Sequence, residues 1–187
     1  GREGEVTPVF VYTNYPTAEL FINGKSYGKQ SKNNSSLKNR YRLMWMDTKY
    51  EPGEVKVVAY DKNGKAVAEK VVRTAGKSHH IELVSNRNEL TADGKDLAYV
   101  TVKVVDKDGN LCPADNRQIN FSVKGTGKYR AAANGDPTNL EQFHLPKMHA
   151  FNGMLTAILQ AGETAGEIVF TAKANGVKAG NIRIQTK

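Results

Sequence analysis

The segment ANGDPTNLEQFH, residues 133–144, contains side-chain types that are used in acid–base catalysis and in metal binding. It includes Asp136, Glu141 and His144, and His149 lies shortly beyond it. Catalysis by paired carboxylates requires two acids on facing walls of a cleft, with the pKa of one of them raised. Asp136 and Glu141 instead share one predicted loop, and the proline after Asp136 favours an extended backbone whose side chain bonds nearby N–H groups. The pattern favours a structural turn over catalysis.

Metal binding is the second chemistry that these residues could support. Glu141, His144 and His149 could converge on one ion, although nothing in their spacing requires it. His79 and His80 are adjacent in the sequence, so on a strand they are expected to point to opposite faces and not to share a metal. Because composition alone is a weak indication of a metal, we expect no metal and no other cofactor.

The composition is typical of a globular protein, with 39% hydrophobic and 25% charged residues among 187. No apolar run approaches the ~20 residues that cross a bilayer, so we expect no membrane insertion. Cys112 is the single cysteine, and it excludes an internal disulfide and a cysteine-based zinc cluster. The first residues, GREGEVTP, contain neither a methionine nor an apolar signal core, which predicts a segment of a longer protein.

The net charge of +8 raises nucleic acid as a partner. Most lysines lie in turns such as DKNGK and DKDGN, and the densest basic run, Lys29–Arg42, is interpreted as a flexible loop that enters a strand. The sequence has no RNA-binding aromatic signature, no zinc-finger spacing and no basic helix. We therefore expect no nucleic-acid partner, and solvated turn lysines explain the charge.

Short runs of alternating apolar and polar residues fill the chain, with turn sequences about every ten residues. Asn23-Gly24 separates two such runs, and this dipeptide is a strong hairpin signal because both turn positions require positive φ. The predicted strands of the first half are VFVYT, ELFI, KSYG, YRLMWM, EVKVVAY, KAVAEKVVRT and IELV. Those of the second half are LAYVTVKVV, QINFSV, YRAAA, MLTAILQ, EIVFTAKA and VKAGNIRIQ.

This pattern predicts an all-β fold of two tandem immunoglobulin-like β-sandwich domains. The boundary is expected at SNRN, residues 85–88, where two strand-rich regions separate. The predicted domains therefore comprise residues 1–84 and 85–187.

Aromatic residues could stack on sugar rings if they were exposed. Trp45, the single tryptophan, alternates with Tyr41 and Leu43 in a predicted strand, so these three side chains are expected to share one face. A lone tryptophan in mid-strand is more often a core residue than a sugar platform. An exposed cluster of Trp45, Tyr41 and Tyr50 would indicate glycan binding, whereas a buried Trp45 would indicate a structural module.

Motifs in both halves resemble parts of one known family. The segment from Pro8 to Gly76 resembles the domain that follows the catalytic barrel in bacterial glycoside hydrolase family 2 enzymes of the β-galactosidase group. The motifs that carry this resemblance are VYTN, AELFINGKSYG, the tryptophan strand, EPGEVKVVAY and TAG. The segment from Glu89 to Gln185 is similar to immunoglobulin-like modules of the invasin and intimin type, which also form the C-terminal end of many of these glycosidases. The motifs that carry this similarity are ADGKDLAYVTVKVVDKDGN, FNGMLTAILQ and AGEIVFTAKANG. The extended NGDPT…E…FNG loop favours the glycosidase version over an adhesin.

The resemblance implies a parent enzyme that hydrolyses β-galactosides or related glycosides with retention, through two glutamates on a barrel. No position here matches those motifs, so we predict a non-catalytic C-terminal region that acts as structural and docking modules in carbohydrate degradation. The alternative is a stand-alone glycan-binding or cell-surface-binding module. The expected partners are the upstream catalytic domain and a glycan, in a secreted protein located in the periplasm or outside the cell. The candidate glycan or interdomain contacts are Trp45, Tyr50, Asp136, Glu141, Phe143 and His144.

Residues 134–152 form a predicted loop longer than the usual limit of ~12–15 residues, above which loops tend to be functional or disordered. Its apolar residues argue for order; they are Leu140, Phe143, Leu145, Met148 and Phe151. We predict an ordered flap packed by Phe143 and Phe151, with Asp136 and Glu141 bonding backbone groups and the histidines at the surface.

Overall fold

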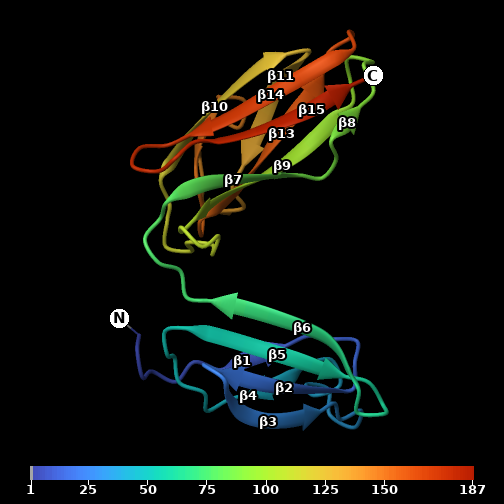
Figure 1. Cartoon of the computed structure of the whole chain (residues 1–187), viewed down its shortest axis with the longest axis vertical. Coiled ribbons are helices and arrows are strands. Elements are labelled where there is room, and N and C mark those ends of the chain that lie inside the picture. Colours follow the sequence, from blue (N-terminus) through green and yellow to red (C-terminus); the bar gives the residue numbers. More distant parts are fainter. Residues whose placement is uncertain (1) are drawn as a thin grey trace. The chain divides into compact units, whose positions relative to one another are not determined.

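The computed structural model describes residues 2–187, and every regular element in it is a β-strand (Figure 1). The chain divides into two compact units, Gly1–Thr74 and Ala75–Lys187. Among residues 2–187 there is no helix of the length and apolar character that a membrane span requires.

Residues 2–74 of the first unit contain six strands in two sheets. These are β1 (Val9–Val11), β2 (Thr17–Ile22), β3 (Lys25–Ser31), β4 (Leu43–Trp45), β5 (Glu54–Tyr60) and β6 (Ala66–Arg73). One sheet has the order β3-β2-β5-β6, and β1 pairs with β4 in the other. The hairpin between β2 and β3 turns at Asn23 and Gly24, whose φ angles of 49° and 80° confirm the predicted positive-φ turn.

Trp45 lies in the core of the first unit and is only 5% exposed. Its indole Nε1 donates to the carbonyl oxygens of Tyr27 and Gly28 at 3.2 Å each, so its polar atom is satisfied. The prediction of a buried Trp45 is confirmed. Tyr41, however, is 64% exposed, because β4 begins at Leu43, opposite the last residue of β1. The predicted shared face of Tyr41 and Trp45 is therefore wrong.

The second unit is a larger sandwich of two sheets, in which all strand pairs are antiparallel except β15 with β8. Its strands are β7 (His80–Ser85), β8 (Glu89–Leu90), β9 (Leu97–Val105), β10 (Gln118–Gly125), β11 (Gly127–Ala133), β12 (Lys147–His149), β13 (Met154–Ala161), β14 (Gly166–Lys173) and β15 (Gly180–Thr186). One sheet has the order β12-β10-β14-β15-β8 and the other β11-β13-β9-β7. Together, the two units confirm the predicted all-β fold of tandem sandwiches.

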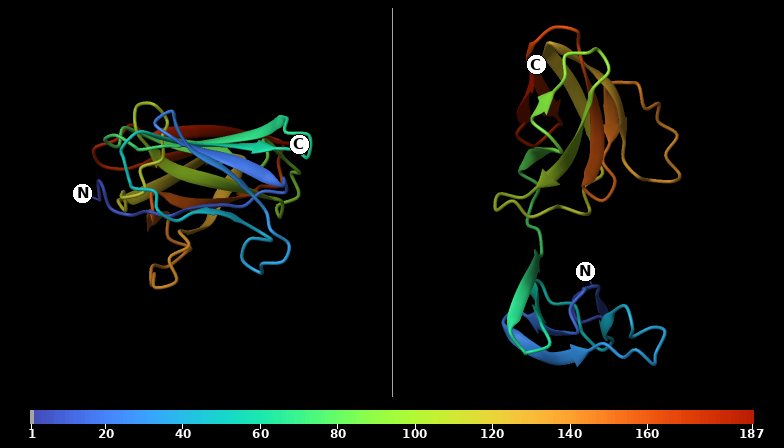
Figure 2. Two further views of the ribbon diagram at one scale, coloured as in Figure 1. Left: turned by 90° about the horizontal axis from the view of Figure 1, so that it is seen from below. Right: turned by 90° about the vertical axis from the view of Figure 1, so that its right-hand side faces the viewer.

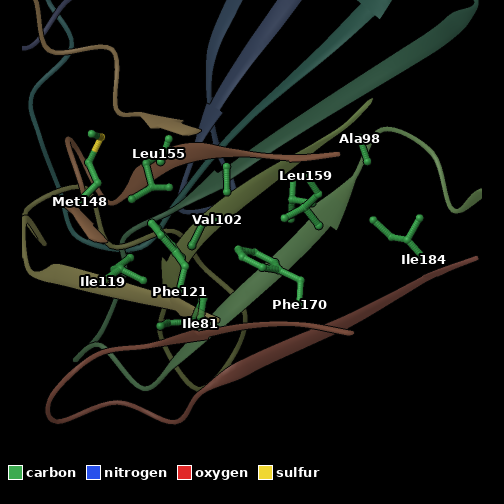
Figure 3. Packing of buried hydrophobic residues seen from close by; sticks show 14 of the residues in the cluster. Ile81, Ala98, Val102, Ile119, Phe121, Met148, Leu155, Leu159, Phe170 and Ile184 are labelled. Carbon is green, nitrogen blue, oxygen red and sulfur yellow. The ribbon is translucent and has the colours of Figure 1, made fainter. Parts of the chain in front are cut away.

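The core of the second unit lies between its two sheets (Figure 3). Alternation along β9 places Ala98, Val100, Val102 and Val104 inward, and none of them is exposed. From the facing sheet, Phe170 of β14 packs into the same layer. Alternating apolar residues therefore direct one face of each sheet into a common core.

The boundary between the units lies at Thr74 and Ala75, not at residues 84 and 85 as the sequence predicted. Strand β7 pairs with β9 of the second unit, along six residue pairs from His80 to Ser85. The segment before β7 is also tied to that unit, since the Gly76 N–H donates to Asp106 Oδ2 at 2.8 Å. The SNRN bend only separates two strands of one sandwich, because strand periodicity does not reveal which sheet a strand joins.

Candidate functional site

The flap of the second unit is the segment of residues 134–146, which connects β11 to β12. It extends away from the sheets and is coloured orange in the right-hand view of Figure 2. The predicted loop continued to residue 152, but Lys147–His149 pair with β10 as strand β12. The flap is therefore shorter than predicted and has a strand at its base.

Backbone groups of the flap are held by the sandwich below it. The Ala132 N–H donates to the Phe143 carbonyl at 2.9 Å. The Tyr129 hydroxyl donates to the carbonyls of Phe143 at 3.0 Å and Leu145 at 2.7 Å. Burial raises the pKa of Tyr129 to about 12, so this hydroxyl remains a donor at neutral pH. These contacts fix the path of the returning half of the flap.

Asp136 organises the first turn of the flap. Its Oδ1 accepts hydrogen bonds from the Thr138 backbone N–H at 2.9 Å and from the Thr138 hydroxyl at 2.7 Å. These two bonds lower the pKa of Asp136, in this order of importance. The structure confirms that Asp136 bonds to backbone, as expected for an aspartate before proline.

Glu141 joins the flap to β12. Its Oε2 accepts the His149 backbone N–H at 3.1 Å, and its Oε1 lies 3.0 Å from His149 Nδ1. Burial acts to raise the pKa of Glu141, but the hydrogen bonds from His149 outweigh burial and leave the pKa below its ordinary value. Glu141 therefore fastens the flap as a charged acceptor, as the prediction of backbone bonding required.

His144 does not join this pair. It is exposed on the flap, and residues 2–187 contain no group of three or more histidine, cysteine or acidic side chains arranged to hold a metal. Glu141, His144 and His149 thus do not form the three-ligand set considered from the sequence.

The tip of the flap presents apolar side chains to solvent. Leu140 is 95% exposed and Phe143 is 55% exposed, and Leu145 is also exposed. The prediction that Phe143 packs the flap onto the sandwich is wrong, because its carbonyl, and not its ring, makes the anchoring contact. Met148, on β12 at the end of the flap, is instead fully buried in the core of the second unit. The flap thus combines a hydrogen-bonded backbone with exposed apolar side chains.

Sequence reasoning missed Tyr129, whose hydroxyl clamps the flap. No local signal could have identified it, because the carbonyls that it binds lie at the far end of the flap. The expectation that His79 and His80 point to opposite faces was also wrong: His79 precedes β7, and its Nδ1 lies 3.0 Å from Nδ1 of His80. A residue outside the strand does not follow the alternation of side chains within it.

The candidates in the first unit form no sugar platform around Trp45. The indole ring is buried, and the Tyr50 hydroxyl lies 3.2 Å from Thr74 Oγ1 at the last residue of that unit. This geometry agrees with a structural module, as the buried tryptophan was expected to indicate.

The chain thus consists of two β-sandwich units, and the second unit carries an anchored flap with an apolar tip. Comparison with known families gives its affiliation. Residues 81–183 match the family model described as glycoside hydrolase family 2 C-terminal domain 5, and residues 4–68 match a domain of unknown function (DUF4982). Because the first match covers more than half of the chain, the chain belongs to the glycoside hydrolase family 2 C-terminal domain 5 family.

Relatives with an assigned name agree with this affiliation. The chain is 40% identical to the β-galactosidase BoGH2A of Bacteroides ovatus over 94% of this chain and 20% of that protein. It is 27% identical to a β-galactosidase of Thermoanaerobacter pseudethanolicus over 96% of this chain and 24% of that protein. The chain thus spans about a fifth to a quarter of the length of these relatives.

Solved structures show the same fold and extent. A glycosyl hydrolase family 2 member from Bacteroides cellulosilyticus matches with a TM-score of 0.87 and 34% identity, over all of this chain and 24% of that one. A β-glycosidase from Bacteroides vulgatus matches with a TM-score of 0.90 and 28% identity, over 99% of this chain and 23% of that one. The chain is the C-terminal accessory region of a glycoside hydrolase family 2 protein.

Proposed function

We propose that the two units serve as non-catalytic structural and docking modules of a β-galactosidase of family 2. The β-galactosidase relatives, at 40% and 27% identity, support this assignment. A putative β-glucuronidase and a β-glucuronidase of Formosa agariphila, at 32% and 25% identity, indicate the alternative substrate class. In the proposed enzyme, the catalytic domain belongs to the same polypeptide and lies outside residues 1–187.

The electrostatics of the flap support a non-catalytic role. A glycosidase acid catalyst needs a raised pKa so that it is protonated near neutral pH. Asp136 and Glu141 both have lowered pKa values, because each accepts hydrogen bonds as a carboxylate. Both carboxylates stabilise the flap and are poorly suited to donate a proton.

The exposed apolar tip of the anchored flap is the observation that carries the docking role. Leu140 and Phe143 point their side chains into solvent although the backbone beneath them is firmly held. Exposed apolar groups on an ordered segment are typical of contact surfaces. A pre-ordered loop also loses little conformational entropy when a partner covers it. The proposed partner is the catalytic region of the same protein.

The location follows from the same proposal. A glycosidase that degrades external carbohydrate is expected in the periplasm or outside the cell, and a chain with one buried cysteine needs no reduced compartment. Fractionation of the producing cells tests this location; activity that stays with the cytoplasmic fraction would contradict it.

The docking role is tested in the full-length enzyme with the double variant Leu140→Asp and Phe143→Asp. We expect faster hydrogen exchange at flap amides and a lower melting temperature of the enzyme, because charges cannot be buried in an apolar contact. The isolated chain should melt like the wild type, since both side chains are exposed in it.

Leu37→Asp is the matched control, because Leu37 is an exposed leucine on a loop of the first unit. It should leave the flap unchanged in both proteins. Equal exchange of flap amides in the isolated chain and in the full-length wild-type enzyme would refute docking of the flap.

A further inference from the structure

A hollow in the first unit lies beside the end of β1 and the loop that precedes β4. It has a volume of about 380 Å³ and is lined by Tyr12, Thr13, Asn14, Lys32 and Tyr41. It is independent of the flap, which belongs to the other unit. Its lining combines aromatic rings with hydrogen-bonding and positively charged groups.

Two tyrosine rings line this hollow without being covered. Tyr12 is 68% exposed and Tyr41 is 64% exposed. Phe10, on the neighbouring β1, is 45% exposed. A tyrosine offers an apolar face for the C–H groups of a pyranose ring and a hydroxyl for its polar edge. Exposed rings beside amide and hydroxyl groups therefore suit a sugar better than a purely apolar partner.

Positive charges surround the same rings. The Lys32 ammonium donates to the Thr13 carbonyl inside the hollow, so its position is fixed. The Arg42 guanidinium lies 5.6 Å from the centre of the Phe10 ring and donates to the Tyr12 hydroxyl at 3.4 Å. The Arg40 guanidinium lies 5.8 Å from the centre of the Tyr41 ring.

These three cations lack acidic partners in the part of the chain that the structure describes. None of Lys32, Arg40 and Arg42 forms an ion pair among residues 2–187. The lining of the hollow also contains no carboxylate. Because each cation retains N–H groups beyond its hydrogen bonds within the protein, the hollow can accept a ligand carboxylate or sulfate.

We propose that this hollow binds an acidic oligosaccharide, with sugar rings on Tyr12 and Tyr41 and a uronate or sulfate group at Lys32 and Arg42. The aromatic pair selects a ring-shaped ligand, and the cations without ion-pair partners select an anionic one. Family membership favours a glycan over single-stranded nucleic acid, which also combines rings with negative charge. The site would hold polymeric substrate near the enzyme, a role separate from docking by the flap.

Calorimetric titration of the whole chain tests the site with three probes: hexagalacturonate, a neutral galactan hexasaccharide and a short single-stranded DNA. We expect hexagalacturonate to bind with a Kd in the range of about 0.1–1 mM and the neutral hexasaccharide about tenfold more weakly. The double variant Tyr12→Ala and Tyr41→Ala should weaken hexagalacturonate about tenfold or more, since each 1.4 kcal/mol changes Kd tenfold. The double variant Lys32→Gln and Arg42→Gln should remove the preference for the acidic probe.

Matched controls are Tyr99→Ala, an exposed tyrosine on β9 of the second unit, and Lys62→Gln, an exposed turn lysine of the first unit. Both should bind like the wild type, and all variants should melt within a few degrees of it.

Three results would overturn the proposal. The first is no binding of hexagalacturonate at millimolar concentration, or binding that the tyrosine variant retains. The second is equal affinity for the neutral hexasaccharide, which removes the role of the cations. The third is tighter binding of DNA than of hexagalacturonate at the same salt concentration, lost in the same variants, which identifies a nucleic-acid site.

Discussion

The two units are both β-sandwiches, but their hydrophobic cores contain very different numbers of buried residues. Among residues 2–74, the core of the first unit consists of six buried residues: Ala18, Leu20, Ile22, Leu43, Trp45 and Ala59. The core of the second unit contains nineteen. The first unit has 74 residues and the second 113, so the difference in core size exceeds the difference in length. A small sandwich with a small core is expected to be the less stable one.

One turn sequence shows how the units also differ in polar contacts. DKNGK begins at Asp61 in the first unit and DKDGN at Asp106 in the second. In both turns, Oδ1 of the aspartate accepts the N–H groups two and four residues further along, at 2.8–2.9 Å. Only Asp106 uses its second oxygen as well, for the Gly76 N–H at 2.8 Å and Asn110 Nδ2 at 3.0 Å. In the second unit, the aspartate of this turn therefore also makes a tertiary contact, with the Gly76 N–H.

The largest expected effect is that of Trp45→Ala. Removal of a buried large aromatic costs about 3–5 kcal/mol, and this is expected to unfold the first unit because its core is so small. The second unit should retain its own unfolding transition in calorimetry. In the wild type, the fluorescence of Trp45 reports on the first unit alone, so it should change at a lower denaturant concentration than the far-UV signal of the second unit.

Simultaneous loss of both units in Trp45→Ala would contradict independent stability. Strong quenching of native Trp45 fluorescence by acrylamide would contradict its burial.

Met148→Ala and Leu140→Ala separate the base of the flap from its tip. Met148 is fully buried in the core, so its truncation should destabilise the second unit by about 2–5 kcal/mol. Leu140 is almost fully exposed, and its truncation should change stability by less than about 0.5 kcal/mol. Urea unfolding of both variants provides the measurement. Similar losses in the two variants would show that the tip packs onto the sandwich.

Asp106→Asn should make the second unit less stable at neutral pH. Hydrogen bonds from the Gly76 N–H, and next from the Asn110 side chain, hold the pKa of Asp106 far below its ordinary value of 3.8. Its contribution is therefore fully present above pH 3.8, decreases as the pH falls below that value, and is lost once folded Asp106 is protonated. At pH 7 we expect the melting temperature of the second unit to fall by roughly 3–8 °C.

The difference between Asp106→Asn and the wild type should narrow between pH 4 and pH 2. Asp61→Asn is the control from the matching turn, and it should leave the transition of the second unit unchanged. A constant difference over the whole pH range would show that ionisation of Asp106 has no part in its effect.

The smallest expected effect is on glycosidase activity, because we expect neither unit to have any. The purified chain should not hydrolyse aryl β-galactosides, because both flap carboxylates are held as hydrogen-bond acceptors. A chromogenic assay after repeated purification is the measurement. Turnover that survives purification and disappears in Glu141→Gln would contradict this prediction.

Local patterns predicted most strands and several side-chain roles correctly. Alternation identified β9 and its inward valines, and Asn23-Gly24 identified its hairpin, because both signals depend on neighbouring residues only. Strand β12 was missed because KMH is too short to show alternation; its pairing with β10 defines it. The flap was recognised as ordered, but which of its apolar residues are buried was not.

The sequence by itself determined the all-β class, the positions of the turns, the burial of Trp45 and the local hydrogen bonds of Asp136, since each follows from residue type and near neighbours. Only the tertiary structure decided that β7 joins the second unit, that Met148 and not Phe143 fills the core, and that Tyr12 and Tyr41 line one hollow. These outcomes depend on contacts between residues far apart in the chain. Strand alternation gives each segment two faces, but the pairing of distant strands decides which neighbour each face meets.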